Sequence, residues 1–510
     1  MAFTETSDVG LPGAKRRQWL TWLLPLVAFV AVYLSLFKWP NTPIWNPHSD
    51  FVQWLGNAQR MLYGDVMYRD FFHYLPPGTE MYYMACLKVF GAHAWLPNAT
   101  SVFLGMVQTS LIFFIARRVL SDGFAALATM LFLGLGYRML DPVHHWFSTS
   151  LLLAGIAVVI SDRSTKRLIA AGILFGLTSF VTTPRGVLAM GGLGIFILYE
   201  SWGRDSWGRI IQRWLVPSLA FIVTYAVVCA PFIALAGFER FYWSTVTYVL
   251  HFHALDERYA IIHGMWPEWN SPRGIIIYGS LLTYPIYFFG RRFLVKEGYP
   301  EKVHLSLALL SFVGLCQIAG VAHYANLFRV ATICAPGFIV GIWLLSTFTR
   351  FAKPACAFLA LASAAILVGR VVNVQRHQTF DFEAPIGRTT FEDEDQLKPY
   401  QWLLAHTRPN EYVFDGNAPN PYFLLGLRNP TNMYYVAPYP STRPEQVAKL
   451  VDSLEKNQVR YIWWTVHRLS PGKGDPLPPL REYMHDHYHV AGSWIDRPYA
   501  DTLEVWERNQ

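Results

Sequence analysis

Long apolar runs separated by short polar segments fill most of the first 375 residues. Most of these runs approach the length of about 20 residues that an α-helix needs to cross a bilayer. The pattern therefore predicts a mainly α-helical fold, a polytopic membrane bundle of about eleven spans. The predicted spans lie near residues 19–38, 98–116, 123–140, 146–161, 168–184, 186–201, 214–236, 273–290, 303–321, 327–348 and 354–372.

Basic residues indicate the direction in which these spans run. Lys15, Arg16 and Arg17 precede the first span, and further basic clusters recur in alternate loops. Loops rich in lysine and arginine tend to stay in the cytoplasm. We therefore expect a cytoplasmic N-terminus and a long first outer loop at residues 39–97.

A shorter apolar piece at residues 77–90 interrupts this outer loop. It is too short to cross a bilayer, and it carries Glu80 and Lys88. We therefore expect a helix that lies in or dips into the outer interface. Counting this piece as a span would also place the next basic cluster outside the cytoplasm.

The pattern changes after residue 375. Residues 376–510 form shorter, more polar segments, in which candidate helices at 393–406 and 443–457 alternate with β-type runs. This alternation predicts a small α/β domain, joined to the bundle by a linker at 379–390. Because an odd number of spans precedes it, we expect the domain to be extracytoplasmic. The β-type runs lie at 412–414, 433–436 and 460–466.

Composition supports a membrane protein. Hydrophobic residues make up 53% of the chain and charged residues only 15%, which is too apolar for an ordinary soluble protein. The formal net charge of +7 reflects the cytoplasmic basic clusters, so nucleic acid is not an expected partner. The five cysteines are scattered and none lies in residues 376–510. We therefore expect neither a disulfide framework nor a metal cluster.

The most informative polar residue, Asp50, follows the first span directly. It places a carboxylate at the outer membrane surface, in a chain whose later spans carry almost no acidic residues. A carboxylate at this position can act as a general base on a substrate presented at the bilayer face. It can also act as the N-cap of a helix that begins at Phe51. Both roles are compatible with the sequence.

With these features the chain resembles the GT-C class of integral membrane glycosyltransferases. It is similar in particular to the bacterial relatives of the protein O-mannosyltransferases and of the lipid A aminoarabinose transferase. Enzymes of this class combine a cytoplasmic N-terminus, a long first outer loop with an acidic residue after the first span, and often an outer C-terminal domain. The resemblance is carried by Asp50, Gly64–Asp65, Tyr68–Asp70, Pro76–Gly78, Asp141–His145, Pro421–Leu424, Arg428 and Pro430.

The resemblance implies an enzyme that moves a sugar from a polyprenyl-phosphate donor to an acceptor hydroxyl with inversion. In such a reaction Asp50 would be the catalytic base, although Phe51 stands where relatives often have a second acid. The acceptor can be a lipid, a glycan or a protein, and membrane lipids surround the enzyme. The sequence requires no cofactor and is compatible with a divalent cation.

Two outer segments contain candidates for binding the acceptor. Asp70 can orient a hydroxyl group and Arg69 can meet a phosphate, but Tyr and Arg also anchor loops to lipid headgroups. The second segment, at 141–145, corresponds to a polar active-site segment of the relatives. A metal shared by His144 and His145 is disfavoured, because neighbouring residues on a helix point in different directions. The candidates are Tyr68, Arg69, Asp70, Asp141, His144 and His145.

Cations near the outer ends of spans are candidates for binding the donor phosphate. Arg185 lies between the fifth and sixth predicted spans, and Arg329 opens the tenth, with His323 nearby. A guanidinium group can hold a phosphate through two parallel hydrogen bonds. The alternative is that these side chains extend to lipid headgroups.

Two other functions are compatible with this architecture. The chain can be a transporter or flippase of a lipid-linked or small substrate, or a non-catalytic scaffold on the same fold. Ion-coupled carriers usually have ionisable residues near the bilayer midplane, whereas these spans contain essentially no Asp or Glu. Catalysis at the outer face of a multi-pass protein of the bacterial inner membrane is therefore the favoured interpretation.

Overall fold

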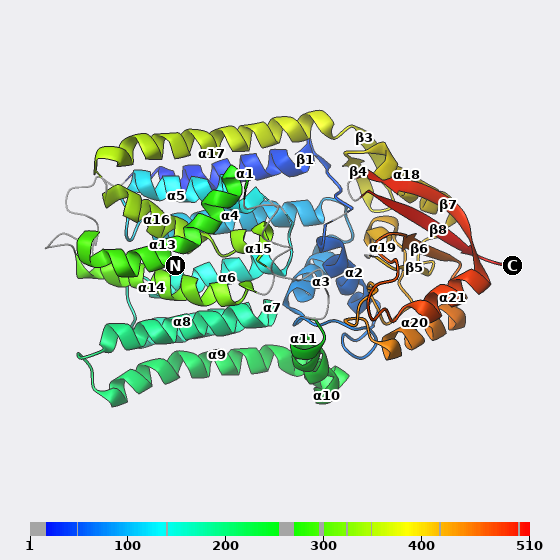
Figure 1. Ribbon diagram of the computed structural model, residues 1–510, viewed down its shortest axis with the longest axis horizontal. Helices are drawn as coiled ribbons and strands as arrows, with labels where there is room; N and C mark the ends of the chain where they lie inside the picture. Colours follow the sequence, from blue (N-terminus) through cyan, green and yellow to red (C-terminus); the bar gives the residue numbers. More distant parts are fainter. Residues whose placement is uncertain are drawn as a thin grey trace.

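The computed structural model describes residues 17–47, 49–138, 141–253, 270–294, 300–322, 325–347, 349–417, 420–497 and 500–510. A bundle of long helices forms one end of the molecule and a domain with a β-sheet forms the other (Figure 1). The bundle contains α1 (Leu20–Leu36), α4 (Leu96–Ala116), α5 (Asp122–Leu135), η1 (Gly136–Arg138), α6 (His144–Val159), α7 (Thr165–Val181), α8 (Thr183–Ser201), α9 (Trp207–Ala236), α13 (Pro272–Leu294), α14 (Glu301–Ala319), α15 (Leu327–Ala331), α16 (Ala335–Thr347) and α17 (Thr349–His377).

Each predicted span overlaps a helix of this bundle, which confirms a polytopic helical membrane protein. The predicted span at 327–348 is divided, because α15 ends at Ala331 and α16 begins at Ala335. Among the described helices, α4, α9, α14 and α17 are long and apolar enough to cross a membrane by length and composition alone. Others, such as the 16-residue α6, are shorter.

The helices of the bundle differ in how much of their surface they bury. α9 exposes large apolar side chains such as Leu219 and Val227, which are 64% and 63% exposed. On its other side α9 packs tightly on α7, where a Cβ atom at Gly172 would lie 2.3 Å from the carbonyl oxygen of Pro217. Glycine is therefore required for this approach, and the exposed face of α9 suits contact with lipid.

The first outer loop lies between the bundle and the C-terminal domain (Figure 1). It contains a short β1–β2 ladder, the 12-residue α2 and the 13-residue α3, which packs against α2. A Cβ atom at Gly78 would lie 2.6 Å from the carbonyl oxygen of Phe180, so α3 begins directly against α7. The bounds are β1 (Phe37–Lys38), β2 (Thr42–Pro43), α2 (Phe51–Leu62) and α3 (Gly78–Phe90).

A second outer segment follows α9. Gly237 adopts a φ of +89°, and the chain continues as three short helical elements. Tyr248 in the last of them donates a 3.0 Å hydrogen bond to the carbonyl oxygen of Ser441 in the C-terminal domain. The three elements are α10 (Phe238–Tyr242), the π-helical η2 (Trp243–Thr247) and α11 (Tyr248–His251).

The C-terminal domain has a four-stranded sheet with the order β5-β6-β8-β7. β5 and β6 are parallel, whereas β8 pairs antiparallel with both β6 and β7. Helices and strands combine here as the sequence predicts for an α/β domain. The elements are α18 (Glu394–His406), β5 (Val413–Asp415), α19 (Asn420–Leu425), α20 (Pro444–Lys456), β6 (Tyr461–Thr465), α21 (Pro478–His487), β7 (Tyr488–Asp496) and β8 (Asp501–Arg508).

Two local predictions in this region are wrong. Residues 379–390, expected to be a linker, contain most of the hairpin of β3 (Phe380–Ala384) and β4 (Gly387–Phe391), which turns at Gly387 with a φ of +116°. Residues 433–436 form no strand. Side chains satisfy the backbone there instead, because Asn429 and Thr431 both donate hydrogen bonds to the carbonyl oxygen of Met433.

Backbone hydrogen bonds join the first outer loop to the C-terminal half of the chain. The Trp45 N–H donates to the carbonyl oxygen of Thr390 at 2.9 Å, and the Phe72 N–H donates to that of Asn432 at 2.8 Å. The loop that carries Asp50 is therefore held between two folded units. The proposed boundary between residues 375 and 376 falls in the last turn of α17, which ends at His377.

Candidate active site

The first outer loop brings Asp50 to the start of α2, where its side chain is exposed. The Asp50 N–H donates a 3.0 Å hydrogen bond to Oδ2 of Asp141, and the Phe51 N–H donates a 3.2 Å bond to Oδ1. Asp141 belongs to the segment just before α6. Two acidic residues from different loops therefore meet at the N-terminus of one helix.

These hydrogen bonds also show which residue caps the N-terminus of α2. Asp50 occupies the N-cap position, but its side chain makes no capping hydrogen bond and its backbone is already helical, with φ −64° and ψ −15°. Asp141 accepts from N–H groups that a helix leaves unpaired at its start. The interpretation of Asp50 as a side-chain N-cap is therefore wrong, and Asp141 performs that role.

The carboxyl groups of Asp50 and Asp141 lie in different electrostatic surroundings. Burial raises the pKa of Asp141, and the neighbouring Asp50 raises it further. Hydrogen bonds from Ser49 and from the backbone of α2 oppose this shift without cancelling it. Asp141 therefore takes up a proton at a higher pH than an isolated aspartate does. Asp50 is the more exposed of the two and the better placed to exchange a proton with a substrate.

His144 and His145, the first two residues of α6, form a polar layer beneath α2. Their ring centroids are 3.9 Å apart. The ring of Trp54 on α2 lies 5.0 Å from His144, and the ring of Phe328 on α15 lies 5.5 Å from His145. Within the described ranges, no group of three or more His, Cys, Asp or Glu residues is arranged to hold a metal ion.

Arg185 is buried in the first turn of α8, with 3% of its surface exposed. Its Nη1 donates to the carbonyl oxygen of His145 at 2.9 Å and to the hydroxyl groups of Ser148 and Thr149 at 3.2 Å and 3.0 Å. Its Nη2 donates to Thr332. The side chain is enclosed by α6, α8 and the segment after α15, so the interpretation of Arg185 as an arginine that extends to lipid headgroups is wrong.

Arg329 adds a second positive charge to this end of the bundle. It lies in α15, is half-buried, and is near enough to Arg185 for the two charges to repel. Among the described residues, no carboxylate forms an ion pair with Arg185. Positive charge is therefore concentrated below α2. His323, the third candidate for the donor phosphate, lies outside the described residues.

Tyr68, Arg69 and Asp70 lie at a separate groove. Tyr68 is buried, has a φ of 69° and donates a 2.7 Å hydrogen bond to the carbonyl oxygen of Leu75. Arg69 and Asp70 form an exposed ion pair of 2.8 Å. These residues line a groove of about 500 Å³, which Trp243 and other residues of the second outer segment and of α20 also line.

The sequence interpretation missed a buried pair between α2 and α3. Glu80 and His73 are both fully buried, and Oε1 of Glu80 lies 3.0 Å from Nε2 of His73. Around the ring, the Leu75 N–H donates to Nδ1 of His73 at 3.1 Å, and the side-chain nitrogen of Gln53 lies 3.3 Å from Nε2. Asn57 on α2 donates a second hydrogen bond, of 3.3 Å, to the same oxygen.

Burial makes this pair neutral. It raises the pKa of Glu80 to about 8 and lowers the pKa of His73 to about 3. The second oxygen of Glu80 is buried and meets no hydrogen-bond donor among the described residues, which also favours the protonated form. Glu80 was taken as a sign that residues 77–90 lie at the interface with water. The structure instead packs this side chain in the core between α2 and α3.

Comparison with solved structures identifies the architecture. The crystal structure of ArnT from Cupriavidus metallidurans in the apo state superposes with a TM-score of 0.61, covering 96% of this chain and 97% of that one at 13% sequence identity. This chain shares its fold with ArnT. The likeness to ArnT confirms the GT-C fold that the sequence resemblance implied, from the bundle to the C-terminal sheet domain.

Two further structures are similar over long stretches of the chain. The Archaeoglobus fulgidus oligosaccharyltransferase in the apo form has a TM-score of 0.48, with 11% identity over 88% of this chain and 70% of that one. The arabinofuranosyltransferase AftD from Mycobacteria has a TM-score of 0.49, with 14% identity over 98% of this chain and 40% of that one. No family model and no curated protein sequence matches the chain. The fold assignment rests on ArnT.

Proposed function

We propose that this protein is a membrane glycosyltransferase that moves a sugar from a polyprenyl-phosphate donor to an acceptor hydroxyl at the extracytoplasmic face. The carrying observation is the position of Asp50, which is exposed at the start of α2 while Asp141 caps that helix. The Asp50 carboxylate takes the acceptor proton as the acceptor oxygen bonds to the anomeric carbon. The bond from that carbon to the phosphate oxygen breaks, polyprenyl phosphate leaves, and the configuration inverts.

Arg185 and Arg329 are proposed to stabilise the phosphate. Taking a charged guanidinium out of water is unfavourable unless an anion compensates it, and no described carboxylate pairs with Arg185. A phosphate at the outer end of the bundle supplies that compensation through charge-assisted hydrogen bonds. His323 is proposed to complete this site.

The remaining candidates are proposed to bind the acceptor. His144 and His145 lie between α2 and the buried arginine, and the Asp141 carboxylate fixes the start of α2. Tyr68, Arg69 and Asp70 border a groove large enough for a polar ligand. A lipid, a glycan or a protein can present the hydroxyl group.

The orientation belongs to the same proposal. The basic clusters place the N-terminus in the cytoplasm and the C-terminal domain outside, in a bacterial inner membrane. Single cysteines at Ser453 and Ser206 in a cysteine-free background report on the two sides. A membrane-impermeant thiol reagent should label the first and not the second in cells with a permeabilised outer membrane. The reverse pattern would place Asp50 in the cytoplasm and refute the proposal.

Native mass spectrometry of the purified full-length protein tests the donor. We expect a co-purifying polyprenyl-phosphate sugar, and transfer of that sugar when acceptor-containing membranes are added. The same preparation of Asp50→Asn should retain the lipid and lose the transfer. Retention of transfer by this variant would remove Asp50 from the mechanism.

A further inference from the structure

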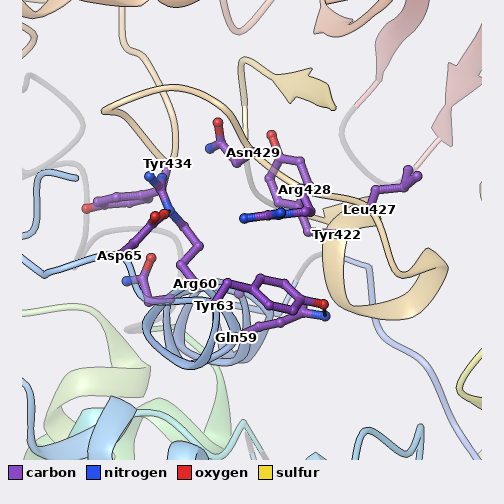
Figure 2. A pocket seen from close by; sticks show the side chains of 11 residues that line it. Gln59, Arg60, Tyr63, Asp65, Tyr422, Leu427, Arg428, Asn429 and Tyr434 are labelled. Carbon is purple, nitrogen blue, oxygen red and sulfur yellow. Dashed lines mark hydrogen bonds and ion pairs between the residues drawn. The ribbon is translucent and has the colours of Figure 1, made fainter. Parts of the chain in front are cut away.

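Three sets of contacts hold α2 along its length. At its start, the carboxylate of Asp141 accepts hydrogen bonds from the N–H groups of Asp50 and Phe51. Near its end, Nε of Arg60 lies 2.8 Å from Oδ2 of Asp65, beside residues of the C-terminal domain (Figure 2). The middle of the helix is held by buried side chains that the proposed function does not yet use.

These buried side chains are Glu80 of α3 and His73, which lies between α2 and α3. Both are fully buried, and Oε1 of Glu80 lies 3.0 Å from Nε2 of His73. Asn57 of α2 donates a 3.3 Å hydrogen bond to the same oxygen of Glu80, and the side-chain nitrogen of Gln53 lies 3.3 Å from Nε2 of His73. Two side chains one turn apart on α2 therefore contact one buried pair.

The proposed base lies on the face of α2 that this pair holds. Asp50, Gln53 and Asn57 are separated by three and four residues, so they follow one face of the helix. Asn57 lies seven residues from Asp50, or about 10 Å along the axis at 1.5 Å per residue. A shift of the helix at Asn57 therefore also moves Asp50, and a displacement of about 1 Å can lower a reaction rate about 100-fold.

The surroundings of Glu80 contain no compensating positive charge. Among the described residues no lysine or arginine forms an ion pair with it, and its second oxygen meets no donor. The titratable neighbours from the first outer loop are His73 and Tyr68, and burial lowers the pKa of the first and raises that of the second, so both are neutral. From α6 the next such group is His144, near His73, and α7 has no titratable residue after Arg167.

We propose that Glu80 is a positioning residue for the proposed base: its protonated carboxyl group joins Asn57 to His73 and fixes the helix that carries Asp50 against α3. We call this contact between Asn57, Glu80 and His73 the latch. An ionised carboxyl group without a partner is unfavourable in this buried place. Loss of the proton therefore favours a displaced α2 that lets water reach Glu80. The inference rests on the proposed function and assigns the placement of its base to a second carboxyl group.

Hydrogen–deuterium exchange of the full-length protein in lipid nanodiscs measures the opening of α2 without any transfer reaction. Buried Glu80 titrates at about 8, against the usual 4.5 in water, so opening of α2 releases a proton between these values. Relative to Glu80→Gln, which cannot ionise, opening in the wild type should become about tenfold more favourable per pH unit from pH 5 to pH 8. Above pH 8 the ratio should level off.

Two controls show whether the effect is local. Peptides from β6 should exchange alike in the wild type and in Glu80→Gln, because opening of α2 alone leaves the C-terminal sheet paired. Glu482→Gln changes an exposed residue of α21 and should follow the wild type in α2 at every pH. A ratio in α2 that does not change with pH would refute the latch. A ratio that rises equally in β6 would show that Glu80 stabilises the whole fold and does not position α2.

Transfer assays at pH 7 test whether the latch places the base. Glu80→Ala removes the contact and should lower the rate of transfer about tenfold or more, while native mass spectrometry finds the donor lipid retained as in the wild type. Glu80→Gln keeps an acceptor for Asn57 and should restore most of the rate, and Glu482→Ala should leave it unchanged. Thermal unfolding checks that each variant is folded. A wild-type rate in folded Glu80→Ala would refute the positioning role.

The latch and the transferase fail separately. Opening of α2 that depends on Glu80 and on pH, in a protein that transfers no sugar, would leave the latch standing and refute the transferase. Sugar transfer by a protein in which the opening of α2 does not depend on Glu80 would refute the latch and leave the transferase standing.

Discussion

The first outer loop and the end of the bundle below it carry opposite chemistry. The loop layer brings together the acidic residues Asp50 and Asp141 at the start of α2. The bundle end concentrates positive charge on Arg185 and Arg329, and no described carboxylate pairs with Arg185. The imidazole groups of α6 lie between these two regions.

This difference suits the two ends of a displacement reaction. A carboxylate can accept the proton of an incoming hydroxyl group, whereas guanidinium groups stabilise the negative charge of a leaving phosphate. The loop at 39–97 also shows that the surroundings of a carboxyl group decide whether it is charged. Glu80, which lies on α3 and is buried beside Asn57 of α2, is held neutral by burial. Burial therefore gives Glu80 a different charge state from that expected of the exposed Asp50.

The largest expected effect tests the acidic side of this comparison. Asp50→Asn removes the proposed base and should lower transfer by about 100-fold or more. Its thermal stability should stay near wild type, because the Asp50 side chain makes no capping hydrogen bond. Asp162→Asn is the control, since Asp162 is an exposed aspartate that pairs with Arg167 away from α2. Equal transfer activity in Asp50→Asn and Asp162→Asn would show that Asp50 is not the base.

The second prediction concerns the neutral carboxyl group. Folded Glu80 titrates at about 8 instead of the usual 4.5, so the folded state holds an extra proton between these values. Stability therefore falls as the pH rises through this window, by up to about 1.4 kcal/mol per pH unit. Glu80→Gln removes that slope and should gain stability relative to the wild type up to pH 8.

Thermal unfolding of both proteins in detergent between pH 5 and pH 9 measures this difference. His73 is present in both proteins, so its own titration largely cancels in the comparison. Glu383→Gln, an exposed residue of the C-terminal hairpin, is the control and should follow the wild type at every pH. A constant offset between Glu80→Gln and the wild type would show that Glu80 is already ionised when folded.

The third prediction tests the basic side. Arg185→Ala should weaken binding of the polyprenyl-phosphate donor by roughly ten- to a hundredfold, as expected for a charged contact to phosphate. Arg185→Lys should recover part of it, because the charge remains and the fork is lost. Donor titrations with folded protein decide, with Arg163→Ala as the control, since Arg163 pairs with Glu200. Equal donor affinities in the wild type and both Arg185 variants would show that Arg185 does not bind the donor phosphate.

The smallest expected effect concerns the anchor between the two outer loops. Asp141→Ala removes the acceptor for the N–H groups of Asp50 and Phe51 and should lower stability by about 1 kcal/mol. Asp141→Asn keeps one acceptor oxygen and should lose less. Thermal unfolding measures both changes. Wild-type stability of the alanine variant would mean that α2 does not depend on this cap.

Much of the architecture was accessible from the sequence, because the length of an apolar run is a local property. The predicted spans overlap helices, and the α/β character of the last part is correct. The helices predicted at 393–406 and 443–457 appear as α18 and α20. The hairpin at 380–391 was missed because each strand has only five residues and β4 buries three residues in succession instead of alternating. The antiparallel pairing of β3 with β4 defines these strands, and the local pattern of hydrophobic residues does not show it.

The sequence by itself determined a membrane bundle with a polar C-terminal domain and an acidic residue after the first helix, since hydrophobicity and order along the chain suffice for these. Only the tertiary structure decided which residue caps α2, that Arg185 is enclosed, and that Glu80 faces His73. It also decided that Arg428 stacks over a tyrosine of α2, hundreds of residues away in the chain. Each of these depends on contacts between segments far apart in sequence, and burial then sets the charge that each group carries.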